Sequence, residues 1–284
     1  MVPPLLAGLV DDAAVFPPGN AALADAIAGH RRYRSAGFAD LVGPLLLPSA
    51  ALTEVAGLLG ADERLSIGVI GTPGQPVAAT LAGLDARLAP RQWEVAVAKR
   101  GEDPQPGLYA LLDQARAELD RHADLALYVE LPLTWGLSGA LDTVASARAD
   151  GVRVAPKFRT GGLVAELFPR PNELAGVICA CRDRDLPFKL TAGLHHAIRH
   201  TDPATSFTHH GFVNILAAVV AAAAGADPVA VTGWLTETDP AALAGVLKPD
   251  LGRPRPLWIG FGTCSVLEPL ADLRELGLLP PEAA

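Results

Sequence analysis

Short apolar runs alternate along this chain with longer stretches of helical pattern. The runs are rich in Val, Leu and Ile and end at Gly, Pro or charged residues, which is typical of strands in a buried parallel sheet. They lie at residues 7–16, 40–47, 65–70, 93–99, 125–131, 152–158, 187–191 and 257–261. A helical stretch follows each of the first seven runs. This alternation predicts βαβ units and a parallel sheet.

Eight such units predict a closed barrel. The alternative is a doubly wound open sheet, which is disfavoured because no G-x-G-x-x-G motif follows the first run. The 284 residues of the chain fit one barrel domain. One connection is unusually long, because residues 195–256 exceed what a single crossover needs, and it is expected to hold extra helices and a covering loop. The predicted fold is therefore α/β, a single-domain (β/α)8 TIM barrel with an enlarged insertion between strands seven and eight.

The composition argues against nucleic acid and membrane as binding partners. Half of the residues are apolar and the net charge is −8, so a basic nucleic-acid-binding face is not expected. The longest apolar run, residues 212–225, is mostly alanine and falls short of the ~20 residues that a membrane span needs. No basic segment precedes an apolar stretch at the start, so no signal peptide is predicted. The odd cysteine count gives no disulfide framework, and a reducing cytoplasmic setting is expected.

Lysine is rare in this chain and falls mostly at predicted strand ends. Only four of the 23 basic residues are lysine, at Lys99, Lys157, Lys189 and Lys248, and the rest are arginine. Barrel enzymes carry their chemistry at the carboxyl ends of the strands. Unlike arginine, a lysine can lose its proton when it is desolvated or placed beside another cation. Lys157 and Lys189 are expected on adjacent strands, where each would lower the pKa of the other. The alternative is that each lysine pairs with a carboxylate or binds phosphate as a point charge.

The strand ends carry a set of short motifs. The sixth run ends in Lys157-Phe158-Arg159-Thr160-Gly161-Gly162, and the seventh ends in Lys189-Leu190-Thr191-Ala192-Gly193. The eighth ends in Gly262-Thr263-Cys264-Ser265. The fifth carries Glu130, and the first carries Asp11 and Asp12. In their order and spacing these strand ends resemble deoxyribose-phosphate aldolase and its class I aldolase relatives.

The resemblance implies a role for several of these residues. Lys157 would be the Schiff-base lysine, and Lys189 the cation that lowers its pKa. Asp11 or Asp12 would assist proton transfer, and Asp12 is favoured because it lies nearer the strand end. Glu130 is the fifth-strand carboxylate of the catalytic group. The chain departs from the family at the fourth strand, whose aspartate has no clear equivalent; Glu94 and Lys99 lie nearest.

The expected substrate-binding residues also lie after the strands. By the resemblance, glycine backbone groups and hydroxyls would hold an anionic substrate tail, and Arg159 would clamp a carboxylate or phosphate where the family has a small residue. The full expected set is Asp11, Arg159, Gly161, Gly162, Thr191, Gly193, His195, His196, Gly262, Thr263 and Ser265.

Histidines support a different hypothesis. Five of the seven lie in one segment, at positions 195, 196, 200, 209 and 210. With Asp11, Asp12 and Glu130 they would offer ligands suited to zinc, manganese or iron, although the spacing matches no known metal motif. His195 and His196 directly follow the seventh strand, so at least one is expected in the pocket as a general acid or base.

The sequence therefore predicts an enzyme that acts on a small, anionic, carbonyl-containing substrate through a lysine Schiff base. This is lyase chemistry of the aldolase type, and it needs no cofactor. Two alternatives stay open: a metal-dependent hydrolase or isomerase that uses the histidines of segment 195–210, and a non-catalytic barrel that binds a small molecule. A small-molecule substrate is the expected partner, without nucleic acid or membrane, and a homo-oligomer is left open.

Overall fold

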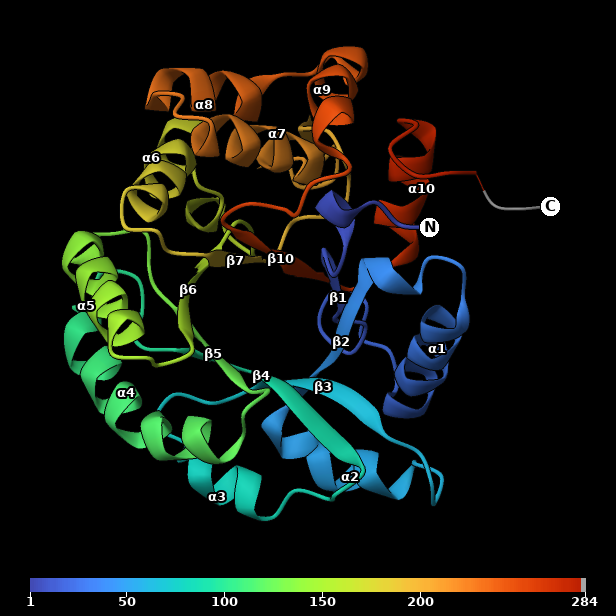
Figure 1. Ribbon diagram of the computed structural model, residues 1–284, viewed down its shortest axis with the longest axis vertical. Coiled ribbons are helices and arrows are strands. Elements are labelled where there is room, and N and C mark those ends of the chain that lie inside the picture. Colours follow the sequence, from blue (N-terminus) through green and yellow to red (C-terminus); the bar gives the residue numbers. More distant parts are fainter. Residues whose placement is uncertain (282–284) are drawn as a thin grey trace. The chain divides into compact units, whose positions relative to one another are not determined.

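Eight strands of the computed structural model, which describes residues 1–281, form one closed parallel barrel (Figure 1). Their order around the barrel is β1-β10-β7-β6-β5-β4-β3-β2. The bounds are β1 Val10–Asp12, β2 Val42–Pro48, β3 Leu65–Ile70, β4 Leu88–Ala96, β5 Ala126–Glu130, β6 Val154–Arg159, β7 Phe188–Thr191 and β10 Trp258–Thr263. The predicted (β/α)8 fold is confirmed.

Two strands differ by more than two residues from their predicted extents. β1 covers only Val10–Asp12, because Gly8 before it takes a left-handed conformation at φ +57° and a turn closes after it, where the Phe16 N–H donates to the Ala13 carbonyl. β4 begins at Leu88, earlier than predicted, because its first residues pair with β3 from Leu65 onward. The apolar pattern of each run alone does not show these limits.

Helices connect the strands and begin where the sequence offers caps. Asp103, Asp227 and Asp239 each accept a backbone N–H at the start of a helix whose first residue is proline, a favourable combination at a helix amino end. The helices are α1 Leu23–Ser35, α2 Leu52–Gly57, α3 Val77–Ala82, α4 Pro104–Arg121, α5 Leu137–Ala149, α6 Pro171–Arg182, α7 Phe212–Ala223, α8 Pro228–Thr236, α9 Pro240–Leu247 and α10 Leu267–Glu275.

The chain divides into two compact units. The first comprises residues 1–12, 31–43 and 159 onward, and it holds β1, β7 and β10. The second comprises residues 13–30 and 44–158, and it holds β3, β4, β5 and most of β2 and β6. Each unit has its own buried apolar residues, such as Phe212 and Phe261, whose rings stack in the first, and Ile67 and Val129 in the second.

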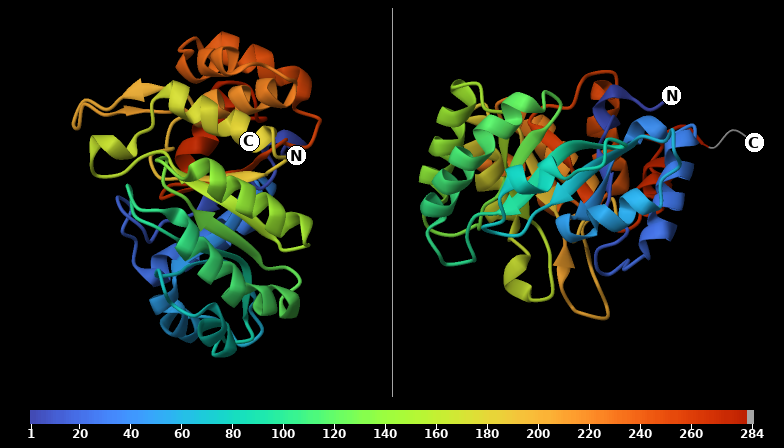
Figure 2. Two further views of the ribbon diagram at one scale, coloured as in Figure 1. Left: turned by 90° about the vertical axis from the view of Figure 1, so that its left-hand side faces the viewer. Right: turned by 90° about the horizontal axis from the view of Figure 1, so that it is seen from below.

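The first unit contains the predicted long insertion. After β7 the chain forms an antiparallel hairpin of β8 His200–Thr201 and β9 Thr208–His209, and then α7, α8 and α9 precede β10. Figure 2 shows this hairpin beside the short helical turn Ala165–Leu167 of the segment that follows β6. The expected extra helices and loop are therefore present between β7 and β10. No helix within residues 1–281 is long and apolar enough to cross a bilayer.

Candidate functional site

Lys157 of the second unit lies buried between two carboxylates. Its Nζ is 2.8 Å from Oε2 of Glu94 and 3.0 Å from Oε2 of Glu130. Lys157 is 4% exposed and Glu94 is 1% exposed, whereas Glu130 is only partly buried. Burial of this kind removes most of the water that would weaken attraction between the charges. The three side chains therefore form one tight ionic group.

The strand register explains why these side chains meet. Ala96 of β4 pairs with Glu130 of β5, which pairs with Lys157 of β6. Residues in register on neighbouring strands point to the same face, and Glu94 shares that face because it lies two residues before Ala96. All of these positions lie at or near the carboxyl ends of their strands, where barrel enzymes place their chemistry.

The two ion pairs of Lys157 within the second unit are both with carboxylates. Opposite charges of this kind favour the ammonium form. A neutral amine would thus require that Glu94 or Glu130 accept the proton. The expected second cation, Lys189, belongs to the first unit, and its effect on Lys157 stays a prediction.

Lys189 of the first unit forms a separate buried ion pair with Asp11. The ammonium of Lys189 donates to Oδ2 of Asp11, and the two residues are 1% and 4% exposed. They stand on β7 and β1, which are separated by β10. On β10, Gly260 pairs with Lys189 and Gly262 pairs with Asp11. Because neither glycine has a side chain, the lysine can reach across β10 to the carboxylate.

Gly43 lies against the carboxylate of Asp11. A Cβ atom at residue 43 would lie 1.9 Å from Oδ1 of Asp11, far inside van der Waals contact. The glycine at this point of β2 therefore lets the carboxylate sit against the neighbouring backbone. Sequence reasoning did not select Gly43, although a glycine inside an apolar strand often marks a close approach of this kind.

Asp12 lies on the other face from Asp11. Adjacent strand residues point to opposite faces, so the ion pair of Asp11 with Lys189 directs Asp12 away from that lysine. In agreement, the pKa of Tyr33 on α1 is raised, mainly by burial and second by the negative charge of Asp12. This effect indicates that Asp12 lies near α1. The structure thus places Asp11, and not the favoured Asp12, against the lysine. The sequence preference differs because it depends on a strand register that the sequence does not reveal.

The loops after β6 and β7 are held together by hydrogen bonds and close backbone packing. Thr160 donates through its N–H to the Thr191 carbonyl at 2.9 Å and through its hydroxyl to the Ala192 carbonyl at 2.7 Å. A Cβ atom on Gly161 would lie 2.7 Å from the Cα of Gly193, so both glycines permit close packing of the loops. This packing accounts for the two glycines without a ligand, and their expected role in substrate binding stays a prediction.

Other expected binding residues lie at the strand ends of the first unit. Arg159 ends β6 and Thr191 ends β7, and both are half-buried. Gly162 packs against Leu167, since a Cβ there would lie 2.3 Å from the leucine Cδ1. Thr263 ends β10, and its hydroxyl contacts the backbone of Ser265 in the following turn.

His195 and His196 contact α10 and the turn before it. Nδ1 of His195 lies 3.2 Å from Oε2 of Glu268 and 3.8 Å from Sγ of Cys264. Nδ1 of His196 lies 3.5 Å from Oδ2 of Asp272. His195 is half-buried and His196 is exposed. Each imidazole thus has a carboxylate that can orient its ring, an arrangement suited to general acid–base chemistry.

Two further histidines of the segment, His200 and His209, form ring contacts with each other and with Phe168. The rings of His200 and His209 stack with centroids 5.2 Å apart, and Phe168 meets His209 edge-on at 4.8 Å. Burial lowers the pKa of His209, and it lowers the pKa of His210 to about 4. Within residues 1–281, no group of three or more His, Cys, Asp or Glu side chains is arranged to hold a metal ion. The ring contacts account for the positions of His200 and His209.

Glu94 is the main residue that sequence reasoning undervalued. It entered only as the nearest candidate for an aspartate that the aldolase family carries. A signal was present, since Glu94 is a charged residue between Trp93 and Val95 in a largely buried strand. Charged residues are seldom fully buried unless they are paired, so such a position indicates a partner elsewhere.

Comparison with known proteins gives no relative for this chain. No family model, curated protein or solved structure matches it. The resemblance to deoxyribose-phosphate aldolase therefore stays a prediction, and the proposed chemistry depends on the geometry of the residues described above.

Proposed function

We propose that this protein is an enzyme that acts on a small carbonyl compound through an imine formed on Lys157. The observation that carries the proposal is the burial of the Lys157 amine within 3.0 Å of two carboxylates at the ends of β4, β5 and β6. A buried lysine with adjacent acid–base groups is suited to covalent catalysis on carbonyl groups. Either carboxylate can accept the proton that the ammonium must lose.

The proton balance of imine formation fits this group. A proton passes from the Lys157 ammonium to Glu94 or Glu130, and the neutral amine forms a C–N bond with the carbonyl carbon. One nitrogen proton moves to the oxygen to give a carbinolamine. The carboxylic acid then protonates the hydroxyl, water leaves, and a protonated imine remains beside a carboxylate. That imine withdraws electrons from the neighbouring carbon, which permits the cleavage of a C–C bond in a lyase reaction.

Lys189 and Asp11 form a buried ion pair within the first unit. The predicted lowering of the Lys157 pKa by Lys189 stays a prediction. Arg159 and the half-buried Thr191 remain the proposed contacts for an anionic part of the substrate.

Borohydride trapping tests the proposed imine. The protein is incubated with simple aldehydes, ketones and 2-oxo acids, reduced with borohydride, and digested for mass spectrometry. We expect a reduced adduct on the peptide that contains Lys157. Lys157→Met should remove the adduct, whereas Lys99→Met, which changes an exposed lysine of the same unit, should leave it.

The test of the proposal is which lysine carries the reduced adduct. Unchanged trapping in Lys157→Met, or an adduct confined to exposed lysines in the wild type, would overturn the proposal. Circular dichroism of each variant separates a loss of chemistry from a loss of folding, because a misfolded variant would lose the barrel signal as well.

A further inference from the structure

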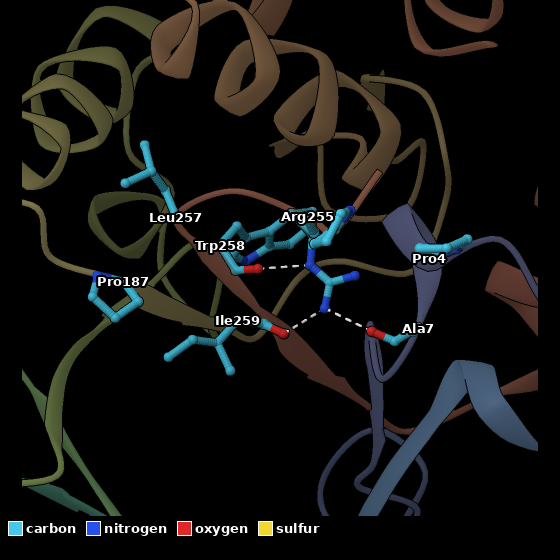
Figure 3. A pocket seen from close by; sticks show the side chains of 8 residues that line it. Pro4, Ala7, Pro187, Arg255, Leu257, Trp258 and Ile259 are labelled. Atoms are coloured by element: carbon cyan, nitrogen blue, oxygen red, sulfur yellow. Dashed lines mark hydrogen bonds between the residues drawn. The ribbon is translucent and has the colours of Figure 1, made fainter. Parts of the chain in front are cut away.

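A cavity of about 360 Å³ lies at the amino-terminal ends of β1, β7 and β10 in the first unit. These strand ends are opposite to those that carry Thr191 and Thr263. The cavity volume falls within the range of small-molecule sites, which is roughly 300–1,000 Å³. Figure 3 shows the cavity from close by, and its lining residues are Pro4, Ala7, Pro187, Pro254, Arg255, Leu257, Trp258 and Ile259.

Arg255 is the one charged residue of this lining. Its guanidinium donates to the carbonyls of Leu5, Ala7, Trp258 and Ile259 at 2.6–3.0 Å. All four acceptors are neutral, and no carboxylate among residues 1–281 lies within ion-pair distance of this guanidinium. Burial lowers the pKa of Arg255 to about 10, and the more distant negative charge of Asp11 offsets this shift only in part.

Arg255 has one donor more than its hydrogen bonds use. A guanidinium carries five N–H groups, and the four bonds of Arg255 leave one N–H on Nη1 without a partner among residues 1–281. A carboxylate bound in the cavity would supply a charged acceptor to this guanidinium.

We propose that this cavity binds a small organic anion, a carboxylate with a short apolar body. The carboxylate would meet the guanidinium of Arg255, which has no counter-ion within ion-pair distance among residues 1–281, and the apolar body would contact Pro187, Leu257 and Ile259. Neutral ligands of the same shape would gain the apolar contacts but not the charge. The site is distinct from the proposed imine chemistry and does not depend on it.

Calorimetric titration of the wild-type chain with hexanoate and hexanamide tests the charge requirement. The two ligands have nearly the same shape and differ in charge. We expect hexanoate to bind about tenfold more tightly than hexanamide and to raise the melting temperature, because a ligand that binds only the folded state stabilises it. Equal binding of both ligands, or no binding of hexanoate, would overturn the proposal.

A cavity-filling variant tests the location. Ile259→Trp places a larger side chain in the cavity, and Val229→Trp adds the same residue at an 80% exposed position of α8 in the same unit. Hexanoate binding should be lost in Ile259→Trp and kept in Val229→Trp. Undiminished binding in a folded Ile259→Trp variant would contradict the assignment. Should that variant not fold, the comparison of the two ligands on the wild-type chain still decides the proposal.

Discussion

The carboxylate of Asp11 occupies the space that a side chain at Gly43 would need, since a Cβ atom there would lie 1.9 Å from Oδ1. This contact joins the packing of β2 to the ion pair of Asp11 with Lys189. A methyl group at residue 43 would therefore push the carboxylate away from its ammonium partner.

Gly43→Ala should destabilise the protein by about 3 kcal/mol, because it disturbs a buried ion pair and forces atoms into overlap. Urea denaturation measures the change. Gly37→Ala is the matched control, because a Cβ at residue 37 has nothing within 4 Å. In an Asp11→Ala background the Gly43→Ala penalty should shrink. A penalty of the same size there would show that Asp11 is not its cause.

Glu94→Gln should shift the pH dependence of imine trapping on Lys157. Removing one carboxylate weakens the preference for the ammonium, so the neutral amine appears at lower pH. We expect the pH of half-maximal trapping to fall by about one unit. Glu54→Gln, at an exposed position of the same unit, should leave the profile unchanged. A shift toward higher pH would refute the proposed charge arrangement.

His210 should make the protein sensitive to acid. Burial lowers its pKa to about 4, below the ordinary value of 6.5. The unfolded chain therefore binds this proton more tightly, so stability is retained above pH 6.5 and lost as the pH falls toward 4. The loss attributable to His210 should be about 2–3 kcal/mol between roughly pH 7.5 and pH 4.5. His210→Gln should reduce the pH dependence of unfolding by that amount, and an unchanged pH dependence would contradict this assignment.

Phe168 should hold the β8–β9 hairpin in place. Its ring contacts Phe207 at a centroid distance of 5.0 Å and His209 at 4.8 Å. Aromatic contacts of this kind contribute roughly 1 kcal/mol each. In Phe168→Ala, amide hydrogen exchange in residues 200–209 should accelerate by about tenfold. Leu163→Ala, a 91% exposed position in the same loop, should not change that exchange, and an equal response would point to a general effect of the loop.

The barrel was predictable from the sequence because its pattern is local. Apolar runs of strand length, separated by helical stretches, identify the βαβ units without knowledge of tertiary contacts. The ends of β1 and β4 were not predictable in this way. Their limits depend on which residues of a neighbouring strand accept their hydrogen bonds, and that pairing is not local.

The candidate site was predictable in residue type but not in pairing. The scarcity of lysine singled out Lys157 and Lys189, and both are buried on barrel strands. Their partners depend on strand register, where a shift by one residue exchanges the two faces of a strand. For this reason the sequence alone does not show that Asp11, rather than Asp12, meets Lys189, or that Glu94 meets Lys157.

The bonds of Arg255 have a consequence for the order of folding. Its acceptor Leu5 lies 250 positions away in the sequence, and β1 pairs with β10 across a similar separation. During synthesis from the amino end, β1 therefore cannot pair with β10 until almost the whole chain has been made. A pause or truncation before residue 255 would leave the exposed edge of β1 open to association with other chains.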